Sequence, residues 1–137
     1  MAAPRFHQPL TGTDPAAIAI IRVFTPVITG ELARMIQFTN PVEWSDLRAG
    51  SVRRAALVDP QHGPIDDIVV SIVATPGDKG NADQTVEPER GWDIWLHLHG
   101  GPGILRRCGE LLGSMGLPAR TPALQTPFPT DDWLEEA

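Results

Sequence analysis

The sequence predicts a single α+β domain with a mixed or antiparallel sheet of about five strands and two or three helices. Short β-branched and aromatic runs between Gly- and Pro-containing turns predict the strands. Apolar residues at helical spacing predict the helices. A chain of 137 residues is long enough to bury one core. We expect an irregular leader over 1–15, the domain itself over 16–129, and the start of a C-terminal helix, cut short by the end of the sequence, over 130–137.

The first predicted strand covers residues 16–24, which read AAIAIIRVF. A β-branched run of this length is typical of a central strand that is buried on both sides. Alternation along the strand gives one face to Ile18, Ile20, Arg22 and Phe24. After it, Thr29 can cap a short helix over 31–37.

Two further strands are predicted over 51–58 and 65–74, on either side of a turn. The turn sequence over 59–63, DPQHG, is rich in turn-forming residues and predicts a β-hairpin. The stretch 76–90 is polar and aperiodic, which predicts an exposed loop. Beyond Gly116, the stretch 117–129 is extended and interrupted by prolines, and 123–125 suits an edge strand.

The stretch 92–105, WDIWLHLHGGPGIL, is the most informative part of the chain. It predicts a strand, a glycine turn that a residue with a Cβ would strain, and a helix with Pro102 in its first turn. One face of that strand carries Asp93, Trp95, His97 and His99. The helix has an apolar stripe made by Ile104, Leu105, Cys108, Leu111, Leu112 and Met115. Free N–H groups at the start of this helix can donate hydrogen bonds to an anion or a ligand oxygen, and His99 would orient that ligand.

Composition limits the classes of function. The net charge of −6 argues against broad binding to nucleic acid, which depends on neutralising phosphates, although a local basic patch is compatible with it. No apolar run approaches the roughly 20 residues of a membrane span, and the N-terminus does not resemble a secretory signal. Cys108 is the single cysteine, so no intrachain disulfide can form. A reducing compartment, the cytoplasm, is therefore expected.

Three ordered segments resemble the N-terminal domain of the MnmE/TrmE family of tRNA-modification GTPases. The first is IIRV at 20–23, where the family reads G-I-G-I-I-R-V-S-G. The second is GPIDDIVVSIVATPG at 63–77, and the third is WLHLHGGPGIL at 95–105, which is similar to the family's E-L-H-C-H-G-G-P. GLPAR at 116–120 also falls where the family has a similar segment, so the resemblance extends over about 16–120.

The resemblance implies a fold related to the folate-binding domain of aminomethyltransferases, a homodimer, and a site for 5-formyltetrahydrofolate. It also implies a role in modifying the wobble uridine of certain tRNAs, with a GTPase domain in a longer chain and a flavin-dependent modification partner. This chain contains no G-x-x-x-x-G-K-[ST] phosphate loop, so we expect no GTPase activity from it. We expect no catalytic residue and no metal in this domain. The ligand-binding residues would be Arg22, Asp93, His99, Gly100 and Gly101.

Arg22 stands where the family has a ligand-contacting arginine, and a guanidinium suits the carboxylates or the pterin oxygen of a folate. Three features of the family are missing, however. Gly91 and Trp92 occupy the positions of its Glu-Asp pair, residues 13–17 replace its glycine-rich turn, and a family lysine falls close to Trp133. Losing one buried hydrogen-bonding partner costs about 1–3 kcal/mol, so these departures weaken the expected folate site. Asp93 would substitute for the lost carboxylate only if the loop before it shifts the register of this strand, relative to the family, by one or two residues.

Other roles for these residues remain open. Arg22 either contacts a ligand or pairs internally with Asp66, Asp67 or Asp93, because a buried arginine needs a partner. The His-x-His spacing of His97 and His99 suits a metal, but no third ligand is evident. The glycine turn resembles an esterase oxyanion turn, but the chain lacks the G-x-S-x-G nucleophile motif.

Two hypotheses about function follow. In the first, the strand over 16–24 and the histidine-bearing strand are neighbours, and their polar side chains converge on one hollow that binds a folate. In the second, the domain is a diverged, non-catalytic dimerisation or scaffold module that has kept the fold and lost the folate.

Overall fold

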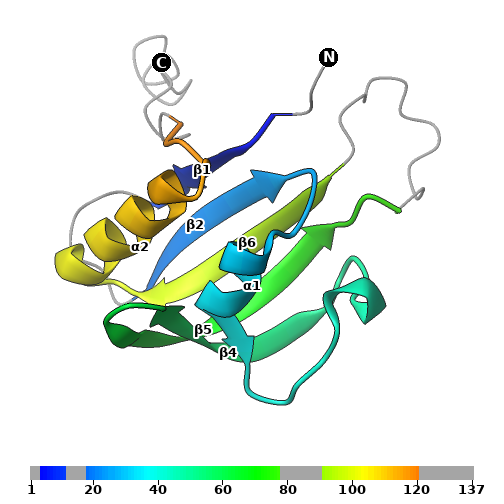
Figure 1. Ribbon diagram of the computed structural model, residues 1–137, viewed down its shortest axis with the longest axis horizontal. Coiled ribbons are helices and arrows are strands. Elements are labelled where there is room, and N and C mark those ends of the chain that lie inside the picture. Colours follow the sequence, from blue (N-terminus) through cyan, green and yellow to red (C-terminus); the bar gives the residue numbers. More distant parts are fainter. Residues whose placement is uncertain (1–3, 12–17, 78–90, 121–137) are drawn as a thin grey trace, which may run out of the picture.

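A computed structural model describes residues 4–11, 18–77 and 91–120 of the chain. These residues form a single small α+β domain with a six-stranded antiparallel sheet and two helices (Figure 1). The elements in chain order are β1 (Phe6–Pro9), β2 (Ile18–Thr25), α1 (Gly30–Met35), β3 (Ile36–Phe38), a 3-10 turn (Trp44–Asp46), β4 (Val52–Asp59), β5 (Gly63–Ala74), β6 (Trp92–His99) and α2 (Pro102–Ser114). The predicted α+β class is confirmed. The predicted strand over 123–125, the helix over 130–137 and most of the loop over 76–90 lie outside the described residues.

The strands lie in the order β1-β2-β6-β5-β4-β3, and each pairs antiparallel with its neighbours. The predicted neighbours β2 and β6 pair along their full lengths, from Ile18 opposite His99 to Thr25 opposite Trp92. This pairing brings together segments that are far apart in the sequence.

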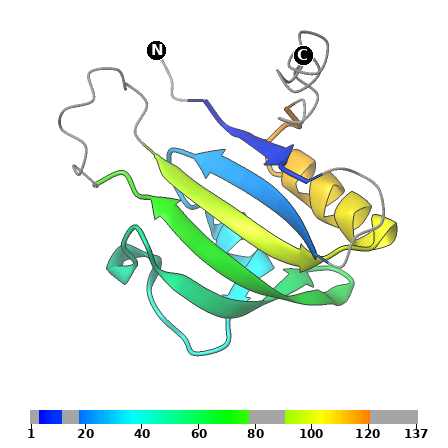
Figure 2. The same cartoon turned by 180° about the vertical axis from the view of Figure 1, so that it is seen from behind.

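Both helices lie on one face of the sheet (Figure 1), while no described helix crosses the other face, which is seen directly in Figure 2. β2 is therefore fully buried along one face only. On its other face only Phe24 is buried, so the prediction that both faces are buried is wrong. Its residues Ala19, Ile21 and Val23 are at most 2% exposed, whereas Ile18 on the open face is 58% exposed. A β-branched run is typical of a strand with two covered faces, but the same residues also suit a strand with one open face.

The helix-covered face holds the core. Its fully buried side chains come from the sheet and from both helices, and they include Ile21, Leu32, Met35, Leu57, Val70, Ile94, Leu96, Leu98, Cys108 and Leu112. The apolar stripe predicted for α2 is confirmed. Cys108 and Leu112 are buried in the core, and the other members of the stripe are half-buried against it.

Two strands were not predicted. The expectation of an irregular segment over 1–15 is wrong at β1, which pairs with β2 and stacks Phe6 on Phe24 with ring centroids 5.6 Å apart. The helix predicted to reach residue 37 ends at Met35, because β3 follows at once and pairs with β4. Thr29 does cap α1, since its hydroxyl accepts a hydrogen bond from the N–H of Leu32 at 3.1 Å.

The predicted hairpin is confirmed as β4 and β5. Asp59 closes its turn by accepting hydrogen bonds from the N–H groups of Gln61 and His62. Gly63 has a φ of +97°, a value that L-residues with a Cβ rarely adopt. In the part of the chain that the structure describes, no helix has the length and apolar character needed to cross a membrane.

Candidate functional site

The five predicted ligand-binding residues fall into two groups, on the central strands β2 and β6 and in the turn that follows β6. Arg22 lies opposite Trp95, whereas His99 lies opposite Ile18. At about 3.4 Å per residue, the offset of four residues between these positions puts His99 roughly 14 Å from Arg22 along the strands. The structure therefore brings Arg22 and Asp93 together and leaves His99, Gly100 and Gly101 at the other end of β6. The expectation that all five converge on one hollow is wrong.

Arg22 and Asp93 form a bidentate ion pair on the open face. Nε of Arg22 donates to Oδ1 of Asp93 at 2.9 Å, and its Nη2 donates to Oδ2 at 2.9 Å. The indole N–H of Trp95 donates to the same Oδ1 at 3.1 Å. Asp93 thus uses three of its four lone-pair sites, and two of the five guanidinium N–H groups are engaged. With side chains 28% and 13% exposed, the pair is accessible from solvent but fixed in place.

Aromatic rings surround this pair. The guanidinium carbon of Arg22 lies 5.3 Å from the ring centroid of Phe6 and 5.7 Å from that of Phe24. Arg120 stacks on Phe6, with its guanidinium carbon 3.7 Å from the ring centroid. Phe24 could have been found from its place beside Arg22 in the alternating pattern. Phe6 and Arg120 could not, because only tertiary pairing brings them here.

The open face continues from this cluster along the sheet. One row of cross-strand neighbours contains Gln8, Arg22, Trp95, Ser71 and Val52, and the next contains Ile20, His97, Val69 and Arg54. Val52 is 64% exposed and Ile18, at the end of β2, is 58% exposed. The hydroxyl of Ser71 and Nε2 of His97 are 3.0 Å apart, so this histidine hydrogen-bonds a serine. Among the described residues, no three His, Cys, Asp or Glu side chains are grouped to hold a metal ion.

At the other end of β6, His99 interacts with Asp66. Nδ1 of His99 lies 2.6 Å from Oδ1 of Asp66, and the N–H of His99 donates to Oδ2 at 2.8 Å. The Asp66 side chain is 8% exposed and that of His99 is 69% exposed. The carboxylate of Asp66 therefore ties the end of β6 to β5 and leaves the outer edge of the imidazole free.

The prediction that a residue with a Cβ would strain the glycine turn is wrong at Gly101. Gly101 caps α2 with a φ of −106°, and a Cβ there would meet no atom within 4 Å. The described glycines with positive φ are Gly50, Gly63 and Gly116, so Gly100 has an ordinary φ as well. Pro102 does begin the helix, as predicted.

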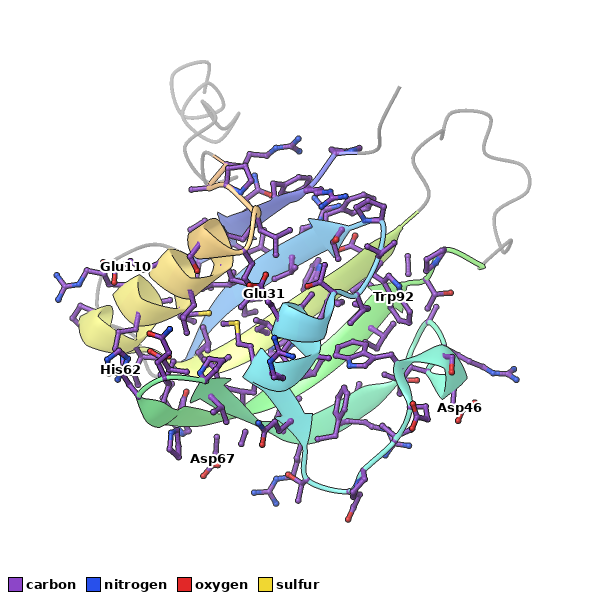
Figure 3. The ribbon with its side chains drawn as sticks, in the orientation of Figure 1. Glu31, Asp46, His62, Asp67, Trp92 and Glu110 are labelled. Atoms are coloured by element: carbon purple, nitrogen blue, oxygen red, sulfur yellow. The ribbon has the colours of Figure 1, made fainter. Side chains whose placement is uncertain are left out.

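Two grooves were not anticipated from the sequence. The interhelical groove, of about 510 Å³, lies between α1, α2 and the β4–β5 turn. Figure 3 labels Glu31, Glu110 and His62, one from each of these elements. Nδ1 of His62 lies 3.0 Å from Oδ2 of Asp59, and Nη2 of Arg107 lies 3.6 Å from the same oxygen. The N–H of Gln61 and the side chain of His62 lower the pKa of Asp59 from its ordinary value, although desolvation opposes them.

The second groove, here called the edge groove, has a volume of about 420 Å³ and lies where β4 extends beyond β3. Thr39, Asn40, Ser51, Val52, Arg53 and Arg54 line it. None of these residues is acidic, in contrast to the interhelical groove, whose lining carries charges of both signs.

Cys108 is not part of either group of predicted site residues and lies in the core. It is fully buried on the inner face of α2, and burial, with a smaller effect from the carboxylate of Asp66, raises its pKa to about 12. It is a core thiol, as the apolar stripe predicted.

A scan against protein-family models and a search of the curated proteins found no match to this chain.

Proposed function

We propose that this chain is a binding and homodimerisation domain of the MnmE/TrmE type, which holds 5-formyltetrahydrofolate on the open face of its sheet. It would act in the cytoplasm in the modification of tRNA wobble uridines, together with a GTPase domain and a flavin-dependent partner. The support for the family is the ordered resemblance of three sequence segments. The observation that carries the ligand proposal is the oriented Arg22–Asp93 pair among aromatic rings, on the sheet face that no described helix covers.

The chemistry of this pair suits a pterin ring. Three guanidinium N–H groups of Arg22 remain for ring oxygen or nitrogen atoms, and one lone-pair site of Asp93 remains for a ring N–H. The flat indole of Trp95 is half-exposed beside them and offers a surface for stacking. In this way Asp93 would replace the carboxylate that the family carries two residues earlier.

The length of a folate suits the separation of the two groups of predicted residues. An extended folate is longer than the roughly 14 Å between Arg22 and His99. With the pterin beside Arg22, the glutamate carboxylates would reach the exposed imidazole of His99. Ile20 and His97 would lie under the central ring, since they occupy the cross-strand row between the two ends.

Dimerisation is supported by the open face itself. This face, which no helix of the described residues crosses and which exposes Ile18 and Val52, offers apolar area for a second copy. A partner covering this face would also exclude water from the ligand. Static light scattering over a wide concentration range tests the proposal, and a constant monomer mass would contradict it.

Isothermal titration with 5-formyltetrahydrofolate tests ligand binding. Saturable heat with the natural chain, lost in Arg22→Ala and kept in Arg106→Ala, is the expected result, since Arg106 is exposed on α2 outside the site. No heat at millimolar ligand would contradict the folate proposal.

The mutual pairing of Arg22 and Asp93 favours one second candidate, a dimerisation or scaffold domain that has lost its folate. A ligand must compete with an ion pair, because the carboxylate of Asp93 already accepts three hydrogen bonds. A dimer by light scattering that gives no heat with folate is the result expected from this candidate.

A further inference from the structure

The edge groove collects positive charge on a protein whose net charge is −6. Arg53 and Arg54 both line it, and neither forms an ion pair with another described residue. Glu43 and Asp46 line a separate hollow beside β3 and the 3-10 turn. Asp59, the acidic residue nearest in sequence, lines the interhelical groove and pairs there with His62 and Arg107. The guanidinium groups therefore have no carboxylate within their own groove.

We propose that the edge groove is a binding site for a phosphate group, held by the guanidinium groups of Arg53 and Arg54. A guanidinium is a planar fork of N–H donors that matches phosphate oxygens in pairs. The hydroxyls of Thr39 and Ser51 and the amide of Asn40 add neutral donors around the same space. This proposal goes beyond the proposed function, because no predicted folate contact lies in the groove.

The groove is built on fixed backbone. The N–H of Thr39 donates to the carbonyl of Arg54 at 3.0 Å, which holds the segment after β3 against the edge of β4. On the other side, Ser51 closes a turn with Arg48, since its N–H donates to the carbonyl of Arg48 and its hydroxyl accepts from the N–H of Arg48. This turn is joined to β5 by two backbone hydrogen bonds with Ile72, of 2.7 and 2.8 Å.

The ends of two strands explain why a hollow forms here. β3 pairs only with residues 55–57 of β4, so the beginning of β4 pairs with β5 on one side and has no described strand on its outer edge. Successive residues of a strand point to opposite faces, and Arg53 and Arg54 therefore approach the open edge from the two sides of the sheet. A phosphate at the edge can be reached by both. Val52, also in the lining and 64% exposed, offers apolar contact for whatever carries the phosphate.

Two sources of phosphate are distinguished by two probes, inorganic phosphate and a single-stranded RNA dodecamer of mixed sequence. Each is added to the full 137-residue chain, and backbone amide shifts are followed by NMR. Saturable shifts at residues 39–40 and 51–54 with either probe are the expected result. Shifts with inorganic phosphate alone assign a small phosphate ligand, and tighter binding of RNA assigns the nucleic-acid backbone. Absence of saturable shifts with both probes at millimolar concentrations would overturn the proposal.

Charge variants test which side chains are responsible. Arg53→Gln and Arg54→Gln should each weaken binding of the effective probe about tenfold, because each removes a charge-assisted contact. Arg106→Gln, an exposed arginine on α2, is the matched control and should leave the affinity unchanged. If RNA binds, the slope of log affinity against log salt should be about −1.4 for two phosphate contacts and about −0.7 in either variant. Equal affinity in the natural chain and both variants would contradict the assignment.

Discussion

Arg22 and Asp93 are 71 residues apart in the sequence and are joined by two parallel hydrogen bonds of 2.9 Å across neighbouring strands. The pair connects β2 and β6 on the open face of the sheet, and the indole of Trp95 adds a third hydrogen bond to the carboxylate. The pair orients the guanidinium of Arg22 toward solvent among aromatic rings, and it also stabilises the pairing of β2 with β6.

Removing one partner of this pair should cost more stability than removing both. Arg22→Gln leaves a carboxylate that is 13% exposed without its cation, and we expect a loss of about 1–3 kcal/mol in the free energy of unfolding. Urea unfolding of both single variants and of Arg22→Gln with Asp93→Asn gives the coupling energy. A coupling near zero would mean that the pair is no more than a solvated surface contact.

Gly63 and Gly101 each precede a proline in the sequence, but substitution by alanine should change the stability of the protein differently at the two positions. Gly63 has a φ of +97°, so Gly63→Ala should destabilise the protein by about 1–2 kcal/mol. Gly101 has a φ of −106° and free space around its missing Cβ, so Gly101→Ala should be neutral within about 0.5 kcal/mol. Thermal unfolding compares them, and an equal loss in both would contradict the turn geometry described above.

The elements that could be predicted from sequence are those with local signals. The β4–β5 hairpin follows from the five-residue turn over 59–63, and α2 follows from Pro102 and an apolar stripe at helical spacing. β1 and β3 have no such signal. Each is only three or four residues long and exists because a longer strand pairs with it, as Phe6 does with Phe24 and Ile36 with Leu57.

The site was only partly predictable for a similar reason. Alternation correctly placed Arg22 and Asp93 on one face of neighbouring strands. The alternating pattern carries no information on whether the two strands run parallel or antiparallel. In the observed antiparallel register, His99 lies at the end of β6 that is away from Arg22. The two grooves are formed by elements brought together from distant parts of the chain, so neither Arg107 beside Asp59 nor Thr39 beside Arg54 could be inferred.

Cys108 should be unreactive in the folded protein. Its pKa is raised to about 12 by burial, so the thiolate is negligible at pH 8. We expect a disulfide reagent to label it only after unfolding. The unfolded thiol ionises near pH 8.5 and the folded one does not, so this group should lower stability as the pH rises above about 9. Rapid labelling without denaturant would contradict the buried position.

Asp59 should make stability sensitive to acid. Because hydrogen bonds from Gln61 and His62 lower its pKa in the folded state, the unfolded state binds its proton first as the pH falls. This contribution is present above about pH 4 and is lost as the pH falls through the folded pKa. Asp59→Asn should therefore reduce the slope of stability against pH below pH 4, with Asp67→Asn as the control for lost charge. An unchanged slope in Asp59→Asn would contradict this role.

The most direct test of the proposed ligand site uses the indole N–H of Trp95, which donates to Asp93. In a nitrogen-15 correlation spectrum, 5-formyltetrahydrofolate should shift this signal in a saturable way. The signals of Trp44 and Trp92, which contact each other on the helix-covered face of the sheet, should stay in place. Arg22→Ala should abolish the Trp95 shift. A Trp95 signal that does not move at millimolar folate would contradict the account.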